Sequence, residues 1–485
     1  MFLKRKATWH LLLKKKMLTA ALAILTVNLF VALFAAYLTP YDPVRDLQVA
    51  DDFALPEWAT TLMGLRDLPK NFLRKVEVQD WTYQAADDRA RGLEVTRKES
   101  HILVVYSRTG KEEVGETRAS FRHPFEYSST PPKTFVVRVP MNVTALEGEN
   151  VAYRAVVSLV RDTDKTTYPL YDSYPPWRTI SFSRWAESEL VLHSRDTSIA
   201  RRLGISPLER NVAETIFSRK GSYELVIELF FQDFGRSGES GRLECSIGIP
   251  SVRILGLQHG FLGTNHLGAD VFSQLVYGVR VSLIVGFLAA GIAVCLGLVV
   301  GVIAGYKGGF TDQASMFSAD TFMQTPVLPI ILLVMLVFGR NIYIIIAIIA
   351  LMSWMGLARQ LRAWVLSLKE RAFVEAARAI GASDFYVMFK VIAPQTTPLL
   401  VYSFVLSIPG AIMLEAALSL IGFGDPFLPS WGKMINEAWN GGAFSKLAWW
   451  WVAPPIVAIL LLALSFVFIG YGLEETLQPA LKRRQ

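Results

Sequence analysis

Residues 375–394 read EAARAIGASDFYVMFKVIAP, and this stretch is the most informative in the chain. It is a short, charged, alanine-rich segment that lies between two strongly apolar segments. Alanine favours the helix, and its small side chain projects little, so the backbone of another protein can approach the helix closely. A helix commonly ends at a residue in the left-handed conformation, which glycine adopts easily, so Gly381 is expected to end the first helix. Ser383 can then cap the N-terminus of a second helix. The pattern predicts a helix–turn–helix that docks on a separate protein.

The residues expected to form the docking contact lie on both sides of this turn. Glu375 and Arg378 stand three positions apart, so they can pair with each other or reach a partner. Pro394 is expected to close the second helix before the next apolar segment. An ordinary amphipathic helix at a membrane surface is the alternative interpretation. The predicted docking residues are Glu375, Ala376, Ala377, Arg378, Gly381, Ala382 and Pro394.

The composition is typical of a multi-span membrane protein. Hydrophobic residues make up 52% of the chain and charged residues 19%, and the mean hydropathy is +0.34. Long uncharged runs alternate with polar stretches, and about 20 helical residues cross the hydrocarbon core of a bilayer. We predict six transmembrane helices, at about residues 17–38, 281–306, 314–338, 342–357, 397–422 and 446–471.

Basic residues set the predicted orientation of the chain in the cell (inner) membrane. The first apolar run is too long for a cleaved signal peptide, so we interpret it as a retained span. By the positive-inside rule, both termini and the 375–394 stretch are cytoplasmic. The net charge of +7 then reflects topology and contact with membrane lipid, and no nucleic-acid binding is predicted. The terminal cations are Lys4, Arg5, Lys6, Lys14, Lys15, Lys16, Lys482, Arg483 and Arg484.

A long polar region, residues 44–258, separates the first two apolar runs, and this topology places it outside the cytoplasm. Residues 168–177 are rich in aromatics and prolines; they could bind a ligand, but a structural cap or docking platform is the favoured interpretation. Turn residues punctuate the strand-like runs, which predicts a mainly β, sandwich-like domain. The strand-like runs are 101–108, 134–142, 151–161, 223–232 and 245–255, and one helical stretch is expected at 185–203.

No catalytic, metal or cofactor site is predicted. Cys295 lies in a predicted span and Cys245 in the polar region, which excludes a disulfide framework and disfavours a thiolate metal site. The Gly-Lys pairs at 110–111 and 432–433 lack the rest of a phosphate-binding loop. The chain is therefore not expected to bind ATP in that way.

Three residues inside predicted spans are candidates for a pathway or gating role. Asp320 and Glu415 fall within or at the ends of spans, where an ionised group has to face protein or water. For Glu415 a structural or gating role is favoured over a direct place in the pathway. Pro409, followed by a glycine, is expected to break the fifth helix.

Several motifs in sequential order resemble one family of transporters. The stretch 261–283 reads FLGTNHLGADVFSQLVYGVRVSL and opens the second span. With the 375–394 stretch, these motifs resemble permeases of ABC importers of the dipeptide/oligopeptide/nickel family, in particular the subunit with a short N-terminal tail. The resemblance covers residues 17–43 and 261–485. The other motifs are TPYDP at 39–43, LSLIGFG at 418–424, PSWG at 429–432 and GLEETLQP at 472–479.

The chain also departs from that family. Ala269, Gln274 and Phe317 stand where relatives usually carry arginine, whereas Asp320 and Pro326 match. The connection at 44–258 is much longer than in ordinary relatives. These departures indicate a divergent subfamily and weaken the transfer of a substrate.

The resemblance implies an all-α polytopic domain of six transmembrane helices with an inserted, mainly β extracytoplasmic domain. The implied parts are a basic tail and first helix at 1–43, the insertion at 44–258, and a five-helix core at 259–485 with a coupling loop at 366–396. Pro326 joins Asp320, Pro409 and Glu415 as a possible pathway or gating residue. The implied protein is a non-catalytic permease subunit that imports peptides or similar polar solutes.

The resemblance also implies partners, which are two cytoplasmic ATPase subunits, a second and different permease, and an extracytoplasmic solute-binding protein. Two other functions stay open at this point. An ABC system that exports or remodels envelope material would suit the enlarged external domain. A membrane-anchored sensor or binding module would make that domain the working part of the chain.

Overall fold

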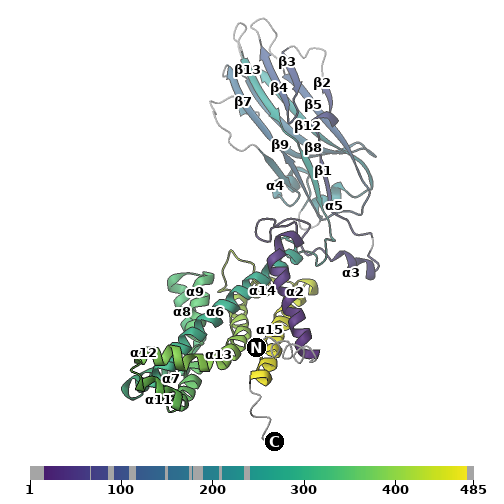
Figure 1. Ribbon diagram of the computed structural model, residues 1–485. Coiled ribbons are helices and arrows are strands. Elements are labelled where there is room, and N and C mark those ends of the chain that lie inside the picture. Colours follow the sequence, from purple (N-terminus) through teal and green to yellow (C-terminus); the bar gives the residue numbers. More distant parts are fainter. Residues whose placement is uncertain are drawn as a thin grey trace. The chain divides into compact units, whose positions relative to one another are not determined.

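The computed structural model describes residues 16–65, 67–85, 92–108, 116–147, 151–173, 177–178, 189–206, 210–233 and 241–477. The chain folds as two compact units (Figure 1). The helical unit comprises Met1–Leu47 and Ala269–Gln485, and the β unit comprises Gln48–Gly268. The sequence placed these divisions after residues 43 and 258. The terminal cations other than Lys16, the 174–176 part of the aromatic patch and the last two residues of the GLEETLQP motif lie outside the described residues.

Within the described residues, five helical stretches are long and apolar enough to cross a membrane. This agrees with the prediction of a polytopic helical domain, because every predicted span corresponds to a helix or a helix pair. The elements are α2 (Lys16–Leu38), α6 (Val271–Lys307), α9 (Ile342–Leu351) followed by α10 (Met355–Leu368), α13 (Thr397–Leu420) and α15 (Trp449–Leu477).

The remaining predicted span, 314–338, is broken in the structure. It consists of α7 (Gly309–Gln324) and α8 (Val327–Phe338), which are bent by 88° relative to each other. The break falls at Thr325, which has an extended backbone and precedes Pro326. A residue before proline is disfavoured in the α conformation, which explains the position of the bend. The described helices make six spans if this bent pair counts as one.

Two details of the predicted helices are wrong. The second span begins at Val271 instead of 281, because the Asp270 side chain caps the helix by accepting from the backbone N–H of Ser273. The fifth helix is not broken at Pro409, since α13 runs without interruption from Thr397 to Leu420. A proline in a membrane helix is tolerated when neighbouring groups satisfy the backbone that it frees.

The β unit is a mainly β structure of three antiparallel sheets (Figure 1). The orders are β1-β14-β6-β11, β10-β8-β12-β5-β2 with β9 on β8, and β3-β4-β13-β7. The strands are β1 (Phe72–Lys75), β2 (Thr82–Ala85), β3 (Leu93–Arg97), β4 (Ile102–Arg108), β5 (Glu116–Tyr127), β6 (Thr134–Val139), β7 (Met141–Glu147), β8 (Val151–Arg161), β9 (Thr166–Asp172), β10 (Trp177–Arg178), β11 (Leu190–His193), β12 (Gly221–Asp233), β13 (Gly241–Ile247) and β14 (Ser251–Leu255).

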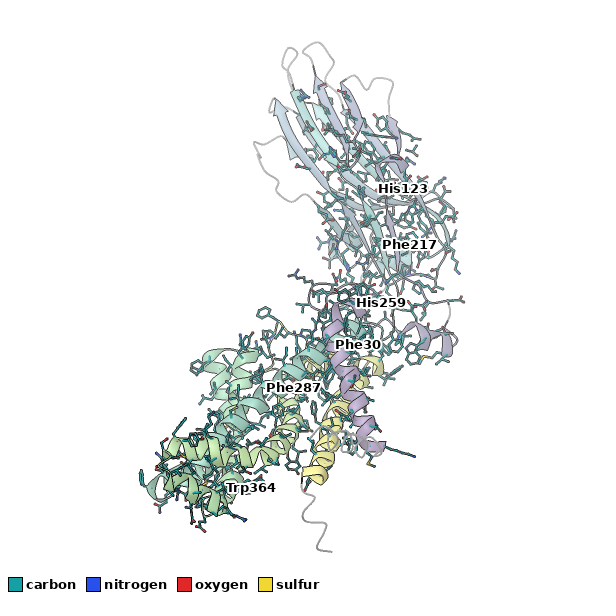
Figure 2. All side chains as sticks on the ribbon, in the orientation of Figure 1. Phe30, His123, Phe217, His259, Phe287 and Trp364 are labelled. Atoms are coloured by element: carbon teal, nitrogen blue, oxygen red, sulfur yellow. The ribbon has the colours of Figure 1, made fainter. Side chains whose placement is uncertain are left out.

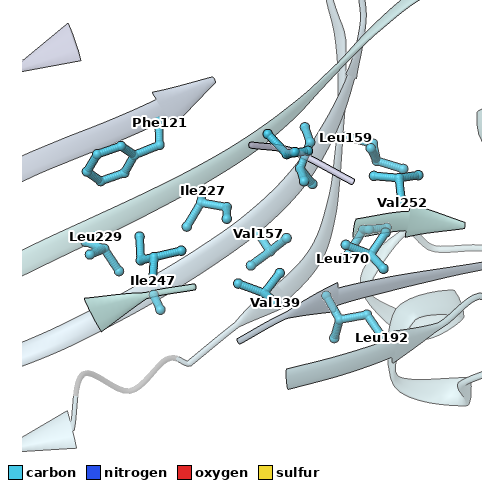
Figure 3. Close-up of a cluster of buried hydrophobic side chains, with 14 of the residues drawn as sticks. Phe121, Val139, Val157, Leu159, Leu170, Leu192, Ile227, Leu229, Ile247 and Val252 are labelled. Carbon is cyan, nitrogen blue, oxygen red and sulfur yellow. The ribbon is translucent and has the colours of Figure 1, made fainter. Parts of the chain in front are cut away.

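Side chains from all three sheets share one core, as in a sandwich. Figure 3 shows Phe121 and Ile227 of one sheet near Val139 and Ile247 of the others. The predicted sandwich-like domain is thus present as a mainly β unit. Two predicted strands are each divided, because 134–142 becomes β6 and β7 and 245–255 becomes parts of β13 and β14. Pro140 lies at the first division and accepts a hydrogen bond from the N–H of Gly248 at the second, over 2.7 Å.

The helix predicted at 185–203 is largely wrong in its described part. Residues 190–193 form strand β11, which pairs with β6, and only α4 (Thr197–Arg202) is helical. The pairing of residues 190–193 with β6 outweighs the helix preference of the two leucines in this run. The remaining short helices of this unit are α3 (Glu57–Leu62), α5 (Val212–Ile216) and a 3-10 turn at Val78–Asp80.

Candidate functional site

The predicted helix–turn–helix is present in the helical unit. The first helix is α11 (Ala372–Ala379), and Gly381 follows it with φ +85°. The N–H of Gly381 donates to the carbonyl of Arg378 over 2.9 Å, and the N–H of Ala382 donates to that of Ala377 over 3.1 Å. This pair of bonds is the Schellman arrangement, in which a glycine adopts the left-handed conformation. The turn therefore depends on Gly381, as its sequence position predicts.

The second helix starts as predicted and ends differently. The Ser383 side chain caps α12 (Asp384–Tyr386) by accepting from the N–H of Tyr386 over 3.4 Å. The chain then continues through a π-helical stretch, Val387–Ile392, and a 3-10 turn, Ala393–Thr396, directly into α13. Pro394 lies in that 3-10 turn. It marks a change of helical geometry, and it does not close the helix, so this detail of the prediction is corrected.

Apolar side chains hold this segment, residues 372–396, against two long helices. Val374 of α11 and Val387 and Ile392 of the second helix are fully buried in a cluster with Val302 of α6 and Val365 of α10. Figure 1 shows α11, α12 and α7 gathered at one end of the helical unit, and Figure 2 places Trp364 of α10 at the same end. The 372–396 segment is therefore attached to the ends of α6 and α10.

A polar contact reinforces this attachment. The Tyr306 hydroxyl, near the end of α6, donates to Asp384 Oδ1 over 2.7 Å. The same hydroxyl accepts from Nε of Arg378 over 3.3 Å, and the guanidinium lies 4.9 Å from the centroid of the Tyr306 ring. One tyrosine thus contacts both helices of the turn. Arg378 is engaged by Tyr306, whereas the Glu375 side chain has no hydrogen bond or ion pair among the described residues.

Helices α6 and α10 approach closely because glycines line their contact. A side-chain carbon at Gly301 would lie 2.6 Å from the carbonyl oxygen of Ala358, and one at Gly305 would lie 2.8 Å from that of Arg362. Gly297, one turn earlier, also faces α10. The spacing of four residues puts all three glycines on one face of α6. The three glycines stand at intervals of four in the sequence, a spacing from which this contact was predictable.

Two ion pairs connect α7 to α10. Arg362 binds Asp312 through two hydrogen bonds, and the one from Nη2 measures 2.6 Å. Arg359 pairs with Asp320, the acidic residue that the sequence predicted for the pathway or gate. Asp320 is more than half exposed in the described chain and has a cation beside it. Pro326 precedes α8 at the bend of 88°.

Glu415 lies in a different place, where α13 meets α14 (Trp431–Asn440). Its Oε1 accepts from the hydroxyl of Ser419 over 2.7 Å, and that hydroxyl in turn accepts from Ser430 over 3.3 Å. The Glu415 side chain is only 2% exposed. Gly432 permits the close contact, since an added side-chain carbon there would lie 2.5 Å from the carbonyl oxygen of Ala416.

The outward face of the 372–396 segment carries both large apolar side chains and charged ones. Ile380 is 86% exposed, Phe385 70% and Tyr386 53%, and Glu375 and Arg378 are also exposed. Large apolar side chains at the tip of a turn are unusual on a free surface and typical of a binding site. No group of three or more potential metal ligands occurs in the part of the chain that the structure describes.

A bundle of apolar spans with an exposed helix–turn–helix between two of them is the arrangement expected of a membrane permease. The chain belongs to the family of binding-protein-dependent transport system inner membrane components, which matches residues 297–483. The matched range lies wholly within the helical unit and includes the 372–396 segment. The resemblance stated from the sequence motifs is thereby confirmed.

Curated relatives support the same assignment. The dipeptide transport system permease protein DppC of Bacillus subtilis (strain 168) is 36% identical over 227 residues, which are 46% of this chain and 69% of that protein. The oligopeptide transport system permease protein OppC of Lactococcus lactis subsp. cremoris (strain SK11) is 37% identical over 216 residues, which are 44% of this chain and 73% of that protein. The chain is accordingly a multi-pass permease subunit of an ATP-driven ABC importer.

Among solved structures, a chain of the MetNI methionine ABC transporter in inward-facing conformations is similar to part of this protein. It is 19% identical, covers 42% of this chain and 96% of its own length, and has a TM-score of 0.34. A TM-score this low does not establish a common fold. The family assignment therefore rests on the sequence match and on the curated relatives.

Proposed function

We propose that this permease imports peptides and that its 372–396 segment receives the force of ATP hydrolysis from a partner subunit. The peptide substrate is supported by the names of the relatives, which are dipeptide and oligopeptide transport permeases. The docking role is supported by one observation above the others. The exposed tip residues Ile380 and Phe385 stand on a turn that is fastened to two long helices.

The contacts indicate how force would pass into the membrane. A push on α11 reaches Tyr306 through Arg378, and a push on α12 reaches the same tyrosine through Asp384. Tyr306 belongs to α6, which packs on α10 without intervening side chains at Gly301 and Gly305. A contact of this kind transmits displacement well, because close-packed interiors have low compressibility. Movement of the segment would thus rock α6 and α10 together.

The remaining docking residues have separate proposed roles. Glu375 has no partner among the described side chains, so it is available to a cation of the ATPase. Ala376 and Ala377 keep the surface of α11 low, and Ala382 completes the turn through its N–H. Pro394 fixes the 3-10 turn that joins the segment to α13.

The four pathway or gating candidates divide into two pairs. Pro326 stands at the bend between α7 and α8, and Pro409 lies inside α13, so we assign gating to both. Asp320 and Glu415 each have a partner inside the helical unit, in Arg359 and Ser419. We assign these two acids to holding neighbouring helices together, with no direct contact to the substrate.

The proposal includes partners and an orientation. Two ATPase subunits would bind in the cytoplasm, a second permease would complete the pathway, and a solute-binding protein would deliver the peptide. Both termini would be cytoplasmic and the β unit extracytoplasmic. The basic residues before α2 and on both sides of the 372–396 segment support this orientation by the positive-inside rule.

Uptake of a labelled peptide by the reconstituted transporter tests this function. Gly381→Trp strains the left-handed position and adds bulk at the docking tip, and Glu375→Lys reverses the free charge. Both variants are expected to reach the membrane, to lose uptake, and to retain less ATPase on co-purification. Undiminished uptake in both would contradict the docking role. Failure of any nucleotide-hydrolysing subunit to co-purify with the unmodified protein would favour a sensor or binding module instead.

A further inference from the structure

The short helix α3 of the β unit exposes its large apolar residues and buries its small ones. Trp58 and Leu62 are four positions apart, on one face, and are 41% and 79% exposed. The opposite face carries the small residues Ala59 and Thr60, each 1% exposed, which pack against the unit. The usual amphipathic arrangement buries the large apolar residues and exposes the others.

The exposed surface continues beyond α3. Met63 is 54% exposed, Leu65 43% and Phe261 62%. We name Trp58, Leu62, Met63, Leu65 and Phe261 the apolar platform. Isolated exposed apolar residues are normal on proteins, but a contiguous group of this kind marks an interaction site.

The platform is held by the β unit and has defined geometry. The Trp58 indole N–H donates to the carbonyl of Phe261 over 2.8 Å. The backbone N–H of Glu57 donates to the carbonyl of Gly260 over 3.1 Å, and the N–H of Leu55 donates to that of Leu257 over 2.9 Å. The start of α3 is thus fastened to the segment that follows β14 and leads out of the β unit. Figure 1 shows α3 at the end of the unit opposite β3 and β4, and Figure 2 places His259 at that end.

The two chain connections between the β unit and the helical unit run through the same two segments that carry the platform, residues 48–65 and 256–268. The N–H groups of Val49 and Ala50 donate to the carbonyl of Gly268, so the entering and leaving segments are paired. Val271, the first residue of α6, comes three residues after Gly268, and an extended chain covers about 3.5 Å per residue. Gly268, the last residue of the β unit, is therefore joined to Val271 by at most about 11 Å of chain.

The start of α6 in turn lies at the edge of the bilayer. The uncharged apolar run of α2 ends at Leu38, and the next residue, Thr39, is hydrogen-bonded to Ser273 in the first turn of α6. The end of one span and the beginning of the next are therefore at the same depth. The hydrocarbon boundary follows from the length of α2, which matches the roughly 30 Å core.

We propose that the apolar platform inserts into the interfacial layer of the bilayer that contains the spans of this chain. The lipid interface accepts tryptophan, phenylalanine and leucine from one face of a short helix. The Trp58 indole suits this depth because its apolar ring enters the acyl boundary while its N–H keeps a hydrogen bond. The platform would fix the tilt of the β unit relative to the membrane. The proposal rests on the membrane assignment and is independent of the substrate and of ATPase docking.

Spin labels on the full-length chain in lipid nanodiscs test the proposal. The natural cysteines Cys245 and Cys295 are replaced by alanine, and one cysteine is introduced at a time as Leu62→Cys, Phe30→Cys or Thr96→Cys. Phe30 of α2 is an exposed residue inside a span, and Thr96 is an exposed residue of β3 at the far end of the β unit. Collisions of each label with oxygen, which enters lipid, and with a water-soluble nickel chelate are then measured.

The label at residue 62 is expected to resemble the one at 30, with nickel collisions reduced at least threefold relative to residue 96 and oxygen collisions raised. Nickel collisions equal to those at 96 would overturn the proposal, because the platform would then face water. Low collisions with both reagents would also overturn it, because a protein partner would then cover the platform. As a second measurement, Trp58→Glu combined with Met63→Glu should restore nickel access to a label at Leu65→Cys, and unchanged access would count against insertion.

Discussion

The guanidinium of Arg378 lies over the ring of Tyr306, 4.9 Å from its centroid, while the hydroxyl of that tyrosine donates to Asp384 over 2.7 Å. The two helices of the 372–396 segment are thereby connected to α6 through one side chain. This relationship gives the proposed coupling a physical route and leads to the first prediction.

Tyr306→Phe is expected to loosen the 372–396 segment without unfolding the helical unit. The variant removes the hydroxyl that contacts Asp384 and Arg378, at a cost of about 1 kcal/mol for a typical hydrogen bond. Amide exchange of the segment should accelerate by about fivefold, which corresponds to that free energy. Hydrogen exchange read by mass spectrometry measures the change. Tyr343→Phe is the matched control, because Tyr343 is 73% exposed, and exchange that accelerates equally in both variants would contradict the route through Tyr306.

Gly381→Ala is expected to reduce peptide uptake, and Gly381→Asn is expected to reduce it less. Gly381 has φ +85° with no atom within 4 Å of an added side-chain carbon, so the cost is one of backbone conformation alone. A left-handed residue other than glycine costs about 1–2 kcal/mol, and asparagine tolerates the conformation better than alanine. Gly356→Ala is the control, since Gly356 also has open space but no positive φ. Equal uptake in the alanine and asparagine variants would show that the turn does not limit transport.

Gly301→Ala is expected to lower the thermal midpoint of the helical unit. The added methyl group would lie 2.6 Å from the carbonyl oxygen of Ala358, which forces α6 and α10 apart. Overpacking of this kind typically costs about 1–3 kcal/mol. Gly291→Ala is the matched control on the same helix, because its nearest neighbour is Phe404 at 3.8 Å. Scanning fluorimetry in detergent compares the two, and a midpoint for Gly301→Ala as high as that for Gly291→Ala would refute the close contact.

The stability of the β unit is expected to fall as the pH rises from about 4 to about 7. Burial, together with the neighbouring Asp52, raises the pKa of Asp51 to about 7, although the guanidinium of Arg195, 2.8 Å away, opposes the shift. A folded-state pKa above that of the unfolded chain gives stability that is complete at low pH and is lost as the carboxyl ionises in the folded state. The loss is at most about 1.4 kcal/mol per pH unit in that window.

Asp51→Asn tests this pH dependence directly. Thermal unfolding of the variant, measured from pH 4 to pH 8, should show a flatter profile than that of the unmodified protein. Glu94→Gln, on an exposed position of β3, should leave the profile unchanged. Asp52 does not contribute to this pH window, because its pKa lies below the usual value. Burial opposes its ionisation, but its hydrogen bond with Asp51 and the charge of Arg195 lower the pKa. A steep profile retained in the Asp51 variant would assign the effect to another group.

Local sequence signals predicted the parts of the site that depend on neighbouring residues. Gly381 and Ser383 specify the turn and the cap through bonds that span only a few positions, so their roles were visible in the sequence. Tyr306 is far from Arg378 and Asp384 in the chain, and no local pattern connects them. The break at Pro326 could have been anticipated, because a residue before proline disfavours the helix, whereas Pro409 shows that the same signal does not always end one.

The β unit shows the same limit. The strand runs at 101–108 and 151–161 were found from β propensity, and they became β4 and β8. The strand β11 at 190–193 was missed, because its partner β6 lies more than fifty residues earlier and supplies the pairing that decides its conformation. Tertiary pairing of this kind overrides local propensity.

Cross-linking between the 372–396 segment and the ATPase subunit tests the central claim most directly. Ile380→Cys, in a chain whose natural cysteines are replaced by alanine, is treated with a short bifunctional thiol and amine reagent in membranes that contain the whole transporter. Tyr343→Cys is the control, since Tyr343 is similarly exposed but belongs to α9, at the opposite end of the helical unit from α11 (Figure 1). The account predicts an adduct with the ATPase from residue 380, with a yield that changes on addition of ATP, and none from residue 343. An adduct from 343 alone, or none from 380 while an ATPase co-purifies, would contradict it.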